Sequence, residues 1–156
     1  GMLLVSNGAW AFGWAKPVPV AFHKLGNPRR DMILVAAAGP GANLLMAMGW
    51  ALSLSLILPY SGDGGIGSWA ARVCLTGITI NVLLAVFNML PIPPLDGGRV
   101  LAGLLPVEMA SAVHKVEPFG FFIVIGLLLT NNLAPILEPV LLPLLRFFER
   151  TVAGLA

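Results

Sequence analysis

The chain has 156 residues, of which 58% are apolar and 10% are charged, and nine Lys plus Arg against seven Asp plus Glu leave a net charge of +2. So few charges cannot cover the water-facing surface of a soluble domain of this length, and the composition therefore predicts a protein embedded in a lipid bilayer. No basic stripe with interleaved aromatic residues occurs, which argues against a nucleic-acid partner.

Uncharged runs place the membrane segments, because a helical crossing needs about 20 consecutive apolar residues. Residues 1–15 are uncharged but too few for a full crossing, and they lack the basic start of a signal peptide. We expect there a truncated span whose beginning lies upstream of this chain. Residues 32–58, 73–95 and 118–137 contain no charged side chain and predict three full spans.

The C-terminal part, residues 131–150, has Pro135, Pro139 and Pro143 at intervals of four. Each interior proline removes a helical hydrogen bond, which disfavours a plain long helix and favours an interfacial or re-entrant segment. The expected fold is thus all-α, a polytopic helical membrane protein. Residues 1–150 would form a single membrane-embedded core and residues 151–156 a tail.

The first predicted span contains AAAGPGAN, which groups Gly39, Pro40 and Asn43. Two interpretations are open from the residues alone. The small residues could form a tight packing seam with a kink at Pro40, since small side chains let membrane helices approach closely. Alternatively, the kink and the Asn43 amide could border a polar cavity.

The second predicted span places Asn81 and Asn88 on one helical face and then runs into NMLPIPPLDGGR. Its prolines stop a helix, and irregular backbone at membrane depth is tolerated only inside protein or beside a watery cavity. A carboxylate at such a break, Asp96, is a candidate cation ligand. The alternative roles for Asp96 are an N-cap for a following helix or a simple pair with Arg99. The alternative for the two asparagines is hydrogen bonding between helices.

These strings, together with GWAKPVPV and NPRRDM upstream, resemble the site-2 protease family of intramembrane zinc metallopeptidases, peptidase family M50, in its compact prokaryotic branch. The resemblance runs from about Gly13 to about Phe148. It implies that Asp96 is the third protein ligand of a catalytic zinc and that Asn88 engages the substrate. It assigns a supporting role in shaping the active site to Gly39, Pro40, Asn43 and Gly97.

The resemblance also implies one zinc ion held by Asp96 and two imidazoles, which lowers the pKa of a bound water, with a glutamate as general base. In the family the imidazoles and the glutamate belong to a His-Glu-x-x-His helix N-terminal to the GWAKPVPV block. No such string occurs here, and the two histidines, His23 and His114, are isolated and expected at the surface. We therefore expect a fragment that is inactive alone, with no general base of its own.

The expected function is zinc-dependent cleavage of membrane-embedded protein segments, in a multi-pass protein of a prokaryotic plasma membrane. The expected partners are a transmembrane protein substrate and the lipid bilayer, with self-association left open. The alternatives are a non-catalytic scaffold of the same fold and, ranked below it, a transporter subunit that uses the broken helix as an ion site. The single cysteine, Cys74, excludes an internal disulfide and is expected to be an apolar filler.

Overall fold

The structure, a computed structural model, describes residues 28–62 and 65–155, and these are helical with short connections. The elements in chain order are α1 (Pro28–Ile57), η2 (Leu58–Tyr60), α2 (Ile66–Asn88), α3 (Asp96–Leu104), α4 (Val107–Leu129) and α5 (Leu133–Leu155). No strand occurs in these two ranges, which confirms the all-α prediction. The expected truncated span in residues 1–15 lies outside the described residues.

Three stretches are long and apolar enough to cross a membrane, namely Arg29–Tyr60, Ile66–Asn88 and Val107–Leu129. The protein is therefore a multi-pass membrane protein. The second and third spans do not start where uncharged runs placed them: α2 begins at Ile66 rather than at residue 73, and α4 occupies 107–129 rather than 118–137. Both helices include charged residues near their starts, such as Arg72 and Glu108, because a helix can extend beyond the hydrocarbon into the interface.

The end of α4 also differs from the prediction, and a local backbone conformation explains it. Asn131 has φ 55°, in the left-handed region that terminates helices. The backbone N–H of Asn132 donates back to the Leu127 carbonyl at 3.0 Å. Asparagine adopts this conformation more readily than other non-glycine residues. The uncharged run that continues to residue 137 is therefore divided between α4 and the start of α5.

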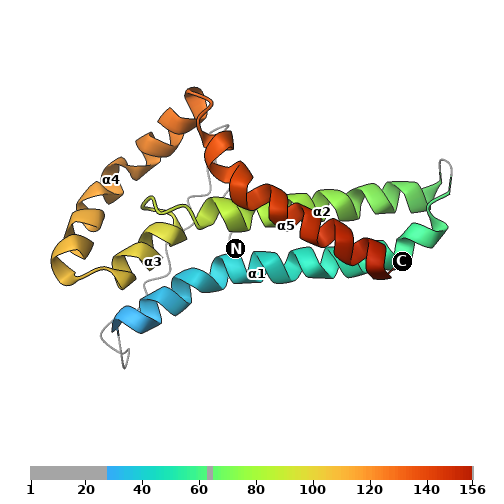
Figure 1. Cartoon of the computed structure of the whole chain (residues 1–156), viewed down its shortest axis with the longest axis horizontal. Helices are drawn as coiled ribbons and strands as arrows, with labels where there is room; N and C mark the ends of the chain where they lie inside the picture. The colour runs from blue at the N-terminus through green and yellow to red at the C-terminus, as the bar shows by residue number, and fades with distance from the viewer. Residues whose placement is uncertain (1–27, 63–64, 156) are drawn as a thin grey trace, which may run out of the picture.

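The core of the molecule lies between α1 and α2, which run side by side in opposite directions (Figure 1). Ala47 and Ala51 have no exposed surface, and Ser55 on the same face is also buried. Across the interface the Trp50 ring covers Gly77, where a β-carbon would lie 2.6 Å from the ring. Ala47, Ala51 and Ser55 thus lie in a close-packed helix contact, as small residues on a membrane helix permit, while the roles expected of Gly39, Pro40 and Asn43 stay predictions.

The helix α5 lies across α1 and α2 (Figure 1) and buries Leu137, Phe148 and Val152 against them. It is one continuous helix through Pro139 and Pro143, so the expectation that the prolines interrupt it was wrong. The physical reason is their spacing: prolines four residues apart share one face, and here that face is exposed. The lost hydrogen bonds therefore fall on the side away from the core. The helix also continues beyond residue 150, where the sequence suggested a tail.

The helix α4 stands away from the α1–α2 pair (Figure 1). Among its residues, all of which the structure describes, Gly120 is the buried one. Large apolar side chains such as Phe119, Phe122 and Leu129 are exposed, as expected for a helix that faces lipid.

Candidate functional site

The chain breaks at the end of α2, as the proline cluster predicts. The helix stops at Asn88, because Pro91, Pro93 and Pro94 have no backbone N–H to continue it. Residues 89–95, called the proline loop below, are closed by turn hydrogen bonds, including Leu95 N–H to the Ile92 carbonyl at 3.0 Å. The chain resumes helical structure at Asp96, the first residue of α3.

Two glycines let α3 fold back onto the proline loop. A β-carbon on Gly97 would collide with the carbonyl oxygens of Met89 and Leu90, and one on Gly98 would lie 2.5 Å from the nitrogen of Pro93. Both glycines are buried. Gly97 therefore permits close contact between the first turn of α3 and the loop backbone, while its role in shaping an active site stays a prediction.

The Asp96 carboxylate lies against α1. A β-carbon on Gly39 would lie 3.0 Å from the Oδ2 atom of Asp96. The AAAGPGAN segment of α1 and the start of α3 therefore meet at this point. The Oδ1 atom is 4.0 Å from Nη1 of Arg99, and the side chain of Asp96 is 28% exposed. One carboxylate oxygen thus faces an arginine, and the other faces a helix position without a side chain.

The alternative roles of Asp96 can be compared with this geometry. The N-cap residue of α3 is Leu95, and no side-chain cap hydrogen bond occurs there. The pair with Arg99 exists, but at 4.0 Å with the arginine side chain 53% exposed it contributes about 0–1 kcal/mol at most. Asp96 therefore has weak structural roles, the pair with Arg99 and a favourable position for a carboxylate in the first turn of α3.

The asparagines of the α1 and α2 membrane spans divide into two groups. The Asn81 amide donates to the Gly77 carbonyl at 2.8 Å and is therefore satisfied by its own helix. Asn43 and Asn88 are half-buried, and within the described residues no hydrogen bond joins their side-chain amides to the protein. Pro40 is buried inside α1 without ending the helix. Asn43 and Asn88 thus remain available to a ligand.

The zinc expectation can be tested against the donors that the structure describes. In residues 28–62 and 65–155 no group of three or more His, Cys, Asp or Glu side chains comes together. His114 is exposed on α4, with Nδ1 3.7 Å from Oε2 of Glu117, and His23 lies outside the described residues. Cys74 is buried in the core as an apolar filler. The described part of the chain thus brings together no set of donors that could hold a zinc ion, and the assignment of Asp96 as a zinc ligand stays a prediction.

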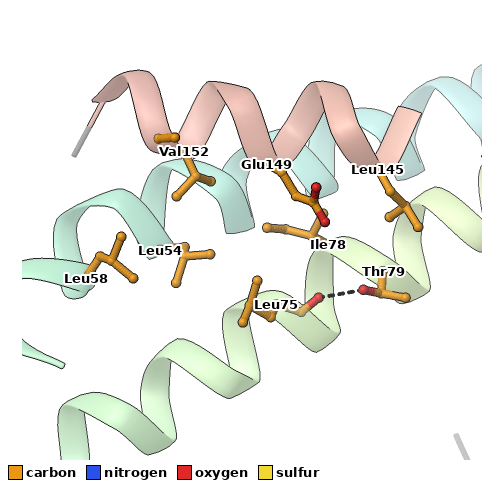
Figure 2. A pocket seen from close by; sticks show the side chains of 9 residues that line it. Leu54, Leu58, Leu75, Ile78, Thr79, Leu145, Glu149 and Val152 are labelled. Atoms are coloured by element: carbon orange, nitrogen blue, oxygen red, sulfur yellow. Dashed lines mark hydrogen bonds between the residues drawn. The ribbon is translucent and has the colours of Figure 1, made fainter. Parts of the chain in front are cut away.

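A separate cavity of about 280 Å³ lies between α1, α2 and α5. Figure 2 shows Glu149 of α5 pointing towards Ile78 of α2, with Leu54 of α1 and Leu75 on the other sides. The Thr79 hydroxyl donates to the Leu75 carbonyl at 2.9 Å. Leu54 is 15 positions beyond Gly39, or about 22 Å along α1, so this cavity is remote from Asp96.

Comparison with known proteins matches residues 65–131 to the model of peptidase family M50. A Bacillus subtilis protein named "Putative zinc metalloprotease YwhC" is 33% identical over 132 residues, which cover 83% of this chain and 60% of that protein. The relative in Mycolicibacterium smegmatis, "Putative zinc metalloprotease Rip2", is 35% identical over 104 residues, 67% of this chain and 38% of the relative.

An archaeal relative extends the comparison to a third lineage. "Putative zinc metalloprotease MJ0611" of Methanocaldococcus jannaschii is 39% identical over 67 residues, 43% of this chain and 31% of the relative. The chain therefore spans between about a third and three fifths of the length of these three relatives. No solved structure matches the chain significantly.

Proposed function

The chain belongs to peptidase family M50, and from that membership we propose that it is part of a zinc-dependent endopeptidase that cleaves membrane-embedded segments of other proteins. The observation that carries the proposal is the position of Asp96. This carboxylate lies at the start of α3, directly after the proline loop that ends the α2 membrane span, and against Gly39 of the membrane helix α1. An acidic residue at such a position costs free energy, and function is the usual reason to keep it.

The described residues around Asp96 suggest a division of roles. Asp96 would supply one carboxylate ligand to zinc, and Gly39 would leave room beside Oδ2 for the metal and its other ligands. The amide of Asn88, at the end of α2, would hydrogen-bond the backbone of a substrate that lies across the break. Gly97 would fix the start of α3, and Pro40 and Asn43 would shape the facing side of α1.

The remaining metal ligands and the general base would then be supplied by a His-Glu-x-x-His segment that this sequence does not contain. This chain would then be inactive alone. The relatives named zinc metalloproteases are longer than the aligned region, which leaves room for such a segment.

The test uses the full-length product of the gene, purified in detergent. We expect about one zinc per chain by elemental analysis, and Asp96→Ala should lower the zinc affinity by more than about 100-fold, since even outer-shell partners contribute about 10- to 100-fold. Cleavage of a model transmembrane substrate should be lost with the metal. Glu138→Gln, an exposed carboxylate of α5, is the matched control and should change neither quantity.

A second candidate is a non-catalytic membrane scaffold of the same fold. The absent His-Glu-x-x-His string is the observation in its favour. It predicts that the full-length product also lacks the string and binds no zinc, and that Asp96→Ala leaves its cellular role intact. Unaltered cleavage by the Asp96→Ala protein would refute the assignment of Asp96 as a ligand.

A further inference from the structure

The one buried residue of α4 touches the loop that leads to Asp96. A β-carbon on Gly120 would collide with the carbonyl group of Pro93 and would lie 3.0 Å from Cδ of Pro94. The atoms in the way belong to the backbone and to a proline ring, so they cannot rotate aside as a flexible side chain can. The absence of a side chain at residue 120 is therefore what lets α4 approach the proline loop.

The same loop is also contacted by the first turn of α3. Gly97 approaches the carbonyls of Met89 and Leu90, and Gly98 approaches the backbone of Ile92 and Pro93. The proline loop is thus enclosed between three glycines on two helices, with backbone against backbone at each contact. Close-packed interiors transmit displacement, because they contain no free volume to absorb it.

A larger residue at position 120 would have to push the loop, push α4 away from it, or both. The second route is opposed by short connections, because α3 is joined to α4 by Leu105 and Pro106 and α5 follows after Thr130 to Asn132. The first route moves Pro93 and Pro94, which precede Asp96 by only three and two residues, respectively. The carboxylate would then leave its position against Gly39.

We propose that Gly120 is a positioning residue for Asp96: by letting α4 rest on the Pro93 carbonyl, it fixes the proline loop and so holds the Asp96 carboxylate against α1. The inference uses the proposed function only for what Asp96 does, since where Asp96 lies is a matter of structure. It also gives α4, which otherwise faces lipid, a definite connection to the site.

The primary experiment measures the position of residue 96 without any metal. In a Cys74→Ala background of the full-length protein, purified in detergent, Gly39→Cys and Asp96→Cys should form a disulfide under mild oxidation. This is expected because the Cγ of Asp96, which the cysteine sulfur replaces, is 4.0 Å from a β-carbon at residue 39. Adding Gly120→Ala or Gly120→Val should slow the cross-link at least about tenfold, because a shift of 1–2 Å exceeds disulfide tolerance.

Gly126 provides a matched control on the same helix, because nothing lies within 4 Å of a β-carbon there. Gly126→Ala and Gly126→Val should leave the cross-linking rate unchanged. The rate is measured on the folded fraction isolated by size exclusion, so a loss of yield at Gly120 does not hide the result. Equal rates for the Gly120 and Gly126 variants would overturn the proposal.

A second readout links position to metal in the protein that retains Asp96. Gly120→Ala should weaken zinc binding by about 10- to 100-fold in chelator competition, as expected for a group that orients a ligand, while Gly126→Ala should not. Slower cross-linking without any zinc binding in the unmodified protein would uphold the positioning role and reject the proposed function. Weaker zinc binding with normal cross-linking would reject the positioning role.

Discussion

Gly39 offers a substitution for which stability and metal binding should move in opposite directions. Gly39→Ala adds one methyl group inside α1. Replacing an interior helical glycine by alanine stabilises a helix by about 0.5–1 kcal/mol, because the unfolded chain loses freedom. The added methyl would lie 3.0 Å from Oδ2 of Asp96, closer than an ordinary van der Waals contact, and 4.0 Å from Cγ.

The Asp96 side chain can yield to this methyl, because it is 28% exposed and Arg99 lies 4.0 Å away on the other side. A turn of the carboxylate by a few tenths of an ångström costs little folding free energy, so we expect the net change in stability to lie between about 0 and +1 kcal/mol. The space beside Oδ2 is lost, however. If zinc binds there, its affinity should fall by about tenfold or more, the lower end of the range for groups that orient a ligand.

The matched control is Gly41→Ala in the same helix, where nothing lies within 4 Å of a β-carbon. It should give the full stabilisation of about 0.5–1 kcal/mol and leave zinc affinity unchanged. Stability is measured by thermal unfolding of the full-length protein in detergent, and affinity by competition with a chromogenic chelator. The reasoning fails if the two variants bind zinc equally well, or if Gly39→Ala is the less stable protein by several kcal/mol.

Two further predictions concern packing and backbone. Gly77→Val should destabilise the protein by about 1–3 kcal/mol in thermal or denaturant unfolding, because the Trp50 ring lies 2.6 Å from a β-carbon at residue 77. Adding Trp50→Ala should recover part of this loss, and strict additivity of the two changes would contradict the contact. Pro143→Ala should raise the free energy of unfolding by up to about 3 kcal/mol, because it restores a backbone N–H inside α5. Pro135→Ala, in the first turn of α5, should raise it by less, and equal increases would contradict the helical assignment.

Composition and chain breaks were accessible from the sequence because they depend on local physics. Sixteen charges in 156 residues imply a membrane protein whatever the fold, and the proline cluster after Asn88 stops a helix wherever it occurs. Helix ends were less accessible. The residues around Arg72 and Glu108 are charged and still helical, because a span can project beyond the hydrocarbon that the uncharged-run criterion detects.

The prolines of α5 mark a second limit of local reasoning. Taken singly, Pro139 and Pro143 predict a break, and the outcome was decided by which face they share and by the packing of Phe148 and Val152 on the other face. A tertiary contact can compensate for a local cost that a sequence pattern alone counts in full.

The candidate site could also be predicted only in part, because its residues were identified from the sequence and their contacts were not. The resemblance singled out Gly39, Asn88 and Asp96, and the meeting of Gly39 with Asp96 is a contact between distant parts of the chain that only the fold reveals. Gly120 was missed. Its signal, one glycine among the large side chains of PFGFF, is visible in the sequence but does not say what approaches it.

The position of Gly39 along α1 sets how far Asp96 lies from water. Its 30 residues extend about 45 Å, longer than the roughly 30 Å of a bilayer's hydrocarbon, and its first turn carries Arg29 and Arg30, which belong at the aqueous boundary. Gly39 lies ten residues after Arg29, about 15 Å along the axis, and the carboxylate is level with it. Asp96 is therefore at most about half a hydrocarbon thickness from that boundary, a depth that a short column of water molecules can bridge.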